Sequence, residues 1–114
     1  MTLVQSLGQF TGTENWFRHG LVREHLYTDG VRHFAEEAGA YWFVDDTIIE
    51  FAPLVNRGEF LSITLTVADS SATIRVEDGD CTVLKTKLIE YTDCPAGEYK
   101  FFYCDKVLML TSEY

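Results

Sequence analysis

The spacing of hydrophobic residues changes from helical in the first half of the chain to alternating in the second half. The apolar residues at helical spacing are Val31, Phe34, Ala35 and Ala38. Thr28 and Asp29 are good N-cap residues, because a short side-chain oxygen accepts from the free N–H groups of a first turn. Gly39 follows the last apolar position, where a left-handed residue commonly ends a helix. The pattern predicts a helix from about Gly30 to Ala38.

A run of five apolar residues, AYWFV at 40–44, follows this helix and must be largely buried. Over residues 40–52, such a run is typical of either a strand or a second helix. The residues that share a helical stripe are Tyr41, Val44, Ile48 and Phe51. This stripe favours the helix, which Pro53 would stop, and the strand remains the alternative.

The first residues of the chain predict shorter elements. Residues 2–10 are expected to form a short amphipathic helix, which Gly8 weakens. Its apolar side consists of Leu3, Val4, Leu7 and Phe10. The segment TGT at 11–13 is a turn, and Thr13 would cap a turn or short helix that carries Trp16 and Phe17.

From Glu59 onward the hydrophobic period is two, which is the pattern of half-buried strands. The predicted strands are 61–67, 72–76, 81–89, 99–104 and 107–110, with turns at 69–70, 78–79, 94–97 and 105–106. Asp78-Gly79 is a strong signal for a type I′ hairpin, which needs positive φ at both central residues. In the third strand, Lys85 and Lys87 are expected on the solvent face.

Short connections between successive strands favour antiparallel neighbours. The sequence therefore predicts an α+β fold, in which short N-terminal helices pack on one face of a C-terminal antiparallel meander of four to five strands. A single domain is expected over residues 1–114, with 1–54 mainly helix and loop and 59–114 forming the sheet. The residues that the alternation places in the core are Leu61, Ile63, Leu65, Ile74, Val76 and Leu84.

Charge narrows the classes of function. The chain has 18 acidic and 9 basic side chains, a formal net charge of −9. Direct binding of nucleic acid is disfavoured, because it needs basic residues to replace phosphate counterions. An acidic surplus commonly serves solubility alone. It is also suited to the basic surface of a host protein, reached by electrostatic steering and anchored by exposed aromatic side chains. The residues predicted to bind this partner are Glu36, Glu37, Asp45, Asp46, Asp78, Asp80, Trp16 and Trp42.

Residue types that serve catalysis or metal binding occur without a motif. Three cysteines with no C-x-x-C predict free thiols and no disulfide framework. His25, Asp29 and His33 are spaced by four residues, but Asp29-Gly30 interrupts the helix that would align them as metal ligands. The sequence contains no nucleophile motif and no phosphate-binding loop. We therefore predict no metal, no cofactor and no catalytic residue.

The sequence carries no signal for a membrane or for secretion. No apolar run approaches the length of a membrane span. The first residues, MTLVQSLGQF, lack the basic start and long apolar core of a signal peptide. A cytoplasmic protein without a membrane partner is the expectation.

Four segments carry a resemblance to a known family: QFTGTENWFRHG, LYTDGVRHFAEEAGAYWFVDD, IEYTDCP and SEY. From about Leu7 to Tyr114 the chain resembles an uncharacterised family of small acidic bacterial proteins, a domain of unknown function often encoded on plasmids, integrated elements and phages. The resemblance implies a mobile-element context and supplies no catalytic residue. In that context a small acidic protein commonly binds a host protein, as an anti-CRISPR inhibitor does when its carboxylates occupy a basic groove.

Two function hypotheses follow from the sequence. The first is a non-enzymatic acidic protein-binding module, in its sharper form an inhibitor of a host nucleic-acid-handling defence system. The second is a small enzyme or ligand-binding domain with a pocket between the helices and the sheet. The residues that would line this pocket are Trp16, His19, His33, Tyr41 or Trp42. The first hypothesis predicts an exposed acidic face, and the second predicts a concave pocket with convergent histidines and carboxylates.

Overall fold

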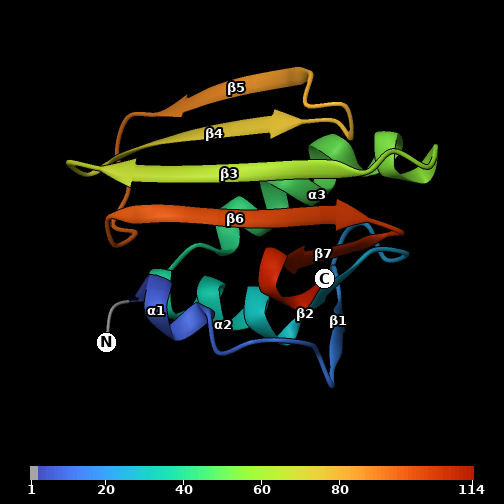
Figure 1. The fold of residues 1–114 in the computed structure, drawn as a ribbon, viewed down its shortest axis with the longest axis horizontal. Coiled ribbons are helices and arrows are strands. Elements are labelled where there is room, and N and C mark those ends of the chain that lie inside the picture. Colours follow the sequence, from blue (N-terminus) through green and yellow to red (C-terminus); the bar gives the residue numbers. More distant parts are fainter. Residues whose placement is uncertain (1–2) are drawn as a thin grey trace.

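The computed structural model describes residues 3–114, which form three α-helices and a seven-stranded mixed sheet (Figure 1). The helices are α1 (Leu3–Leu7), α2 (Asp29–Ala38) and α3 (Tyr41–Asn56), and a short 3-10 helix, η1 (Thr111–Glu113), follows the last strand. The strands are β1 (Trp16–Arg18), β2 (Leu26–Thr28), β3 (Leu61–Ala68), β4 (Ser71–Glu77), β5 (Val83–Ile89), β6 (Gly97–Cys104) and β7 (Val107–Leu110). The α+β class is therefore as predicted.

The strands are not a meander. Their order is β1-β2-β7-β6-β3-β4-β5, so β6 returns to lie beside β3 and not beside β5. The four strands β6-β3-β4-β5 form a Greek key. The physical reason lies in the side chains of β6, whose large buried residues Tyr99, Phe101 and Tyr103 require a central position. In that position Tyr99 pairs with Leu65 and Phe101 pairs with Ile63.

Two strands come from the half of the chain that was expected to be helix and loop. Trp16 and Phe17 lie in β1, and the prediction of a turn or short helix there is wrong. Strand β2 pairs antiparallel with β1 and parallel with β7, which makes the sheet mixed. The Leu26 N–H donates to the Lys106 carbonyl at 2.8 Å and fixes the start of this parallel pairing.

The helices follow the predicted pattern with two differences. Thr28 caps α2 by accepting from the Val31 N–H at 3.4 Å, and Gly39 ends it in the left-handed conformation at φ 61°. Over residues 40–52 the helix alternative is confirmed. Pro53 does not stop α3, which continues for three residues to Asn56. The first helix, α1, is shorter than the predicted 2–10 because the chain turns at Gly8, and Thr2 lies outside the described residues.

The core lies between the helices and one face of the sheet, and α3 passes behind β3 and β6 in Figure 1. Its centre is a cluster of aromatic rings contributed by α2, α3 and β6: Phe34, Phe43, Tyr99 and Phe101. The five predicted core residues of β3 and β4 are buried: Leu61, Ile63, Leu65, Ile74 and Val76. Leu84 is not, because 42% of its surface is exposed.

Strand β5 is oriented opposite to the prediction. Its Lys85 pairs with Val76 and its Lys87 pairs with Ile74, and residues opposite each other in a ladder share one face. Both lysines therefore point to the helix side, and Leu84 points to the open side of the sheet. The preceding loop also differs from the predicted type I′ turn. The residue with positive φ is Cys81, at 64°, as in a three-residue loop that ends in a bulge.

Candidate functional site: an open sheet face with an aromatic end

The predicted partner-binding residues do not form one surface. Glu36, Glu37, Asp45 and Asp46 are exposed on α2 and α3, in the helical layer. Trp42 belongs to the same layer but is partly buried against the core, with its ring centroid 6.1 Å from that of Phe43. Trp16 lies on the opposite face of the sheet, and Asp78 and Asp80 belong to the β4–β5 loop.

The helix carboxylates are partly neutralised by neighbouring groups. Glu36 accepts from Arg32 Nε at 3.0 Å and from the Tyr41 hydroxyl at 3.2 Å. Both hydrogen bonds lower the pKa of Glu36, and the bond from Arg32 has the larger effect. Ion pairs this exposed contribute little to stability. Their carboxylates therefore stay available to a partner, but at reduced net charge.

Asp45 is bound by the buried side chain of His19. The His19 Nδ1 accepts from the backbone N–H groups of Leu21 and Val22 at 3.2 and 3.0 Å. Its proton must therefore lie on Nε2, which donates to Asp45 Oδ1 at 2.8 Å. This arrangement ties the loop between β1 and β2 to α3, so His19 has a structural role.

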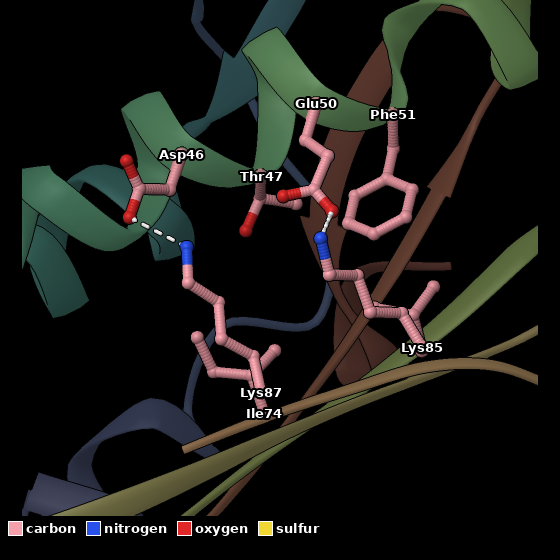
Figure 2. Close-up of a pocket in the computed structure, with 8 residues that line it drawn as sticks. Asp46, Thr47, Glu50, Phe51, Ile74, Lys85 and Lys87 are labelled. Carbon is pink, nitrogen blue, oxygen red and sulfur yellow. Dashed lines mark hydrogen bonds and ion pairs between the residues drawn. The ribbon is translucent and has the colours of Figure 1, made fainter. Parts of the chain in front are cut away.

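Two further ion pairs cross from α3 to the edge strand β5 (Figure 2). Lys87 binds Asp46 at 3.4 Å, and Lys85 binds Glu50. They border a hollow between α3 and the sheet, floored by Ile74 and other core residues. The volume of this hollow is about 10 Å³, the size of a single water molecule. This hollow between α3 and the sheet is therefore too small to be the ligand pocket of the second function hypothesis.

The hairpin aspartates have local roles. The Asp78 carboxylate accepts from the backbone N–H groups of Asp80 and Thr82 at 2.9 and 3.0 Å. These bonds hold the loop in which Cys81 adopts positive φ. Asp80 is exposed at the tip of the loop, where it offers a partner a single carboxylate.

Trp16 lines a hollow on the open face of the sheet. Phe17, its neighbour in β1, packs against Tyr27 and lies under Arg32 of α2, so strand alternation directs Trp16 away from the helices. Trp16 is 54% exposed. With Met109 and Tyr114 it borders a hollow of about 390 Å³. This volume is within the range of about 300–1,000 Å³ that is typical of ligand sites.

Two further rings, those of Phe60 and Phe102, join Tyr114 and extend this region across β6. Tyr114, 76% exposed, packs edge-on against Phe60 at 5.5 Å and against Phe102 at 5.3 Å, and Phe60 contacts Phe102 at 5.0 Å. We call the five residues Trp16, Phe60, Phe102, Met109 and Tyr114 the aromatic patch. Of these five residues, only Trp16 was predicted from the sequence to bind a partner. The missed signal is that FFY at 101–103 and LML at 108–110 are apolar on both faces of their strands, which leaves large side chains outside the core.

Exposed carboxylates lie near residues of the aromatic patch, in the structure or along the sequence. Asp105 lines the same hollow as Trp16, Glu59 precedes Phe60, and Glu14 lies two residues before Trp16. All three are exposed, and within residues 3–114 none of them forms an ion pair. An aromatic surface with unpaired carboxylates is suited to apolar and cationic side chains, which pack on ring faces through cation–π contacts.

The polar residues of the YTDG segment support the fold. The Glu113 carboxylate accepts from the Thr28 hydroxyl at 2.6 Å, from the Gly30 N–H at 3.1 Å and from the Leu110 N–H at 3.0 Å. On the other side of the same helix end, Asp29 accepts from the Glu14 and Asn15 N–H groups. Both carboxylates lie at the positive end of α2, where negative charge is stabilising.

His25 and Tyr103 form a buried polar pair that sequence analysis did not identify. The Tyr103 hydroxyl donates to His25 Nδ1 at 2.5 Å, and His25 Nε2 donates to Asn56 Oδ1 at 2.8 Å. Burial raises the pKa of Tyr103 far above its ordinary value of 10.0, so its hydroxyl stays protonated. The two residues are 78 positions apart, and no local signal connects them. Because both side chains are inaccessible, the pair has a structural role.

Metal binding has no candidate among the residues that the structure describes. Within residues 3–114, no group of three histidines, cysteines, aspartates or glutamates is placed to hold an ion. His33, the second histidine of the predicted spacing, faces Ser6 Oγ at 3.3 Å and the Phe10 ring at 5.2 Å. The absence of a metal remains a prediction. Over the same residues, no helix is long and apolar enough to cross a membrane.

The fold and this surface define an α+β protein whose helices cover one face of a mixed sheet and leave the other face open. The chain belongs to the family of unknown function DUF6876, whose model matches residues 1–114. This membership confirms the resemblance to an uncharacterised family, and its mobile-element context stays a prediction. No curated protein and no solved structure matches the chain.

Proposed function

We propose that this protein is a non-enzymatic binding module that recognises a basic protein surface through the aromatic patch and the exposed carboxylates near it. The observation that carries the proposal is the exposure of Trp16 and Tyr114 on the open face of the sheet, in a chain of net charge −9. Tryptophan and tyrosine are the residues most often found as binding hot spots. Exposure of several large apolar side chains to water is unfavourable in free energy, and a partner that covers them removes this penalty.

The three histidines support this proposal over the enzyme alternative. Each is engaged by a neighbouring side chain: His19 by Asp45, His25 by Tyr103 and His33 by Ser6. None of them lines the hollow beside Trp16. A general acid or base has to reach its substrate directly or through one water. The ligand-binding alternative rests instead on the 390 Å³ hollow, where a small aromatic-stacking ligand would compete with the protein partner.

The partner class follows from charge and from the family resemblance. The surplus of carboxylates favours a basic host protein, and a nucleic-acid-handling protein presents such a surface. We therefore propose a host nucleic-acid-handling protein as the partner and, in a mobile-element context, inhibition of a host defence system of the kind that anti-CRISPR proteins block. The carboxylates predicted from the sequence, including Glu36 and Glu37, would add long-range steering in this account.

Affinity capture from a bacterial lysate, followed by mass spectrometry, tests the proposal. Immobilised wild-type protein should retain a basic protein that a Trp16→Ala/Tyr114→Ala variant fails to retain. The control is Leu21→Ala, which removes a large exposed apolar side chain from a loop outside the aromatic patch. Equal capture by all three proteins, or capture of acidic proteins only, would contradict the proposal.

A further inference from the structure

The sheet has two edges that differ in length. At one edge β1 has three residues, and at the other β5 has seven. Strand β5 pairs with β4 on one side, and its other side meets no strand in the described residues (top of Figure 1). A long unpaired edge offers backbone N–H and C=O groups to another strand.

A bulge interrupts the pairing of β5 with β4 between Val83 and Lys85, and the ladder is regular from Lys85 to Ile89. The side chains of the strand add little to this protection of the edge. On the open face Leu84 and Leu88 are 42% and 67% exposed. On the helix face Lys85 and Lys87 point inward, and inward charges normally discourage a second strand. Here, however, each lysine is bound by a carboxylate of α3, so an incoming strand meets neutralised pairs.

The sequence of β5 is symmetric about its centre. Residues 84–88 read Leu-Lys-Thr-Lys-Leu in both directions, flanked by Val83 and Ile89. In an antiparallel pairing of two copies about Thr86, each leucine of one copy lies opposite a leucine of the other. Each lysine lies opposite a lysine whose own carboxylate partner is beside it. A two-fold interface requires this kind of self-complementary patch.

We propose that two copies of this chain associate through β5, which pairs antiparallel with β5 of the second copy about Thr86 and joins the two sheets. The centre of the edge is locally neutral, with two lysines and their partners Asp46 and Glu50, whereas Asp80 and Glu90 beyond its two ends add negative charge. Two copies that each carry a net charge of −9 can therefore approach there with the least repulsion. This inference goes beyond the proposed function, because β5 lies at the edge of the sheet opposite β1 and Trp16.

Sedimentation velocity over a range of protein concentrations tests the association. The wild-type chain of 13.0 kDa should shift to twice this mass as concentration rises. Higher salt should strengthen the dimer, because it screens the repulsion between two acidic copies. A Leu84→Lys/Leu88→Lys variant places like charges opposite each other and should raise the dissociation constant about tenfold or more. Leu21→Lys is the matched control and should leave it unchanged.

A cysteine on the two-fold axis tests the register. Opposite residues in an antiparallel ladder have Cα atoms about 4.5–5.5 Å apart, within the range of a disulfide. Thr86→Cys should therefore form a covalent dimer on mild oxidation, in a Cys81→Gly background that removes the exposed native thiol. Thr66→Cys, on the interior strand β3, should not.

The outcomes separate the inference from its alternatives. A protein that stays monomeric at all concentrations overturns it. A dimer that survives Leu84→Lys/Leu88→Lys and gives no Thr86 disulfide also overturns it, because that dimer uses another surface. Trp16→Ala should leave the dimer intact, so the test does not depend on the aromatic patch.

Discussion

The carboxylate of Glu113 accepts a hydrogen bond from the hydroxyl of Thr28 at 2.6 Å, across 85 positions of sequence. It also accepts from the Gly30 N–H, so the segment after β7 supplies a cap to the start of α2. The YTDG and SEY segments of the family resemblance therefore meet at one helix end. Their residues hold the sheet and the helical layer together, which accounts for them without a catalytic role.

Substitution of Gly30 should disturb this contact. A Cβ atom there would lie 2.5 Å from Leu110 Cδ1 and 2.6 Å from Glu113 Oε1. We expect Gly30→Ala to lower the free energy of unfolding by about 1–3 kcal/mol, the usual effect of overpacking. Gly20→Ala is the control, because a Cβ atom there meets nothing within 4 Å. Equal denaturant midpoints for the two variants would refute the close packing at Gly30.

Truncation of one side chain on each face of the sheet should distinguish the buried face from the exposed face by its effect on stability. Ile63 is fully buried on β3, and Ile63→Ala should cost about 2–5 kcal/mol. Leu84→Ala removes an exposed side chain and should change stability by about 0.5 kcal/mol or less in the monomer. Urea unfolding at low protein concentration measures both. A large loss of stability in Leu84→Ala would indicate that Leu84 is buried, as the sequence had predicted, and would contradict the orientation of β5 in the structure.

Asp29 should make stability depend on pH in the acid range. Burial raises the pKa of this carboxyl, but the N–H groups of Glu14 and Asn15 outweigh burial and lower it below 3.8. A carboxyl whose pKa is lower in the folded state stabilises the fold above its unfolded value, and this contribution disappears as pH falls through the folded value. The difference in stability between wild type and Asp29→Asn should therefore be present at pH 7 and shrink below about pH 4.

Gly20→Ala is the matched control for this titration, because it changes no titratable group and a Cβ atom there meets nothing within 4 Å. Its stability difference from wild type should not change over the same pH range. A difference for Asp29→Asn that stays constant from pH 7 to pH 3 would show that the carboxylate charge at the start of α2 has no effect.

The sequence predicted the local elements better than their arrangement. The α2 helix could be predicted because its apolar spacing, its N-cap at Thr28 and the glycine at its end, Gly39, all indicate the same helix. The position of β6 was not, because the connection at 90–96, taken as short, lets β6 reach either β5 or β3, and only the packing of Phe101 beside Ile63 decides between the two. Local patterns hold no information on such pairings.

The candidate site was predicted in part. The exposed carboxylates of α2 and α3 follow from amphipathic spacing, and their exposure is as expected. Trp16 was identified as an anchor, but its neighbours Phe102 and Tyr114 were not, because only the folded sheet brings residues 16, 102 and 114 to one face. The ion pair between Arg32 and Glu36 could be predicted, because the two residues are four positions apart on one helix. The ion pair between Asp46 and Lys87 could not, because only the fold brings α3 beside β5.

The most direct test of the central claim is titration calorimetry with the captured partner. The account predicts that Trp16→Ala/Tyr114→Ala weakens binding by about 2 kcal/mol or more, as truncation of hot-spot residues does. Glu36→Lys/Glu37→Lys should weaken this affinity less and reduce its dependence on salt, because steering charges act mainly on the rate of association. Unchanged affinity after loss of both rings, with binding abolished by the charge reversal, would contradict the account and place the interface on the helical layer.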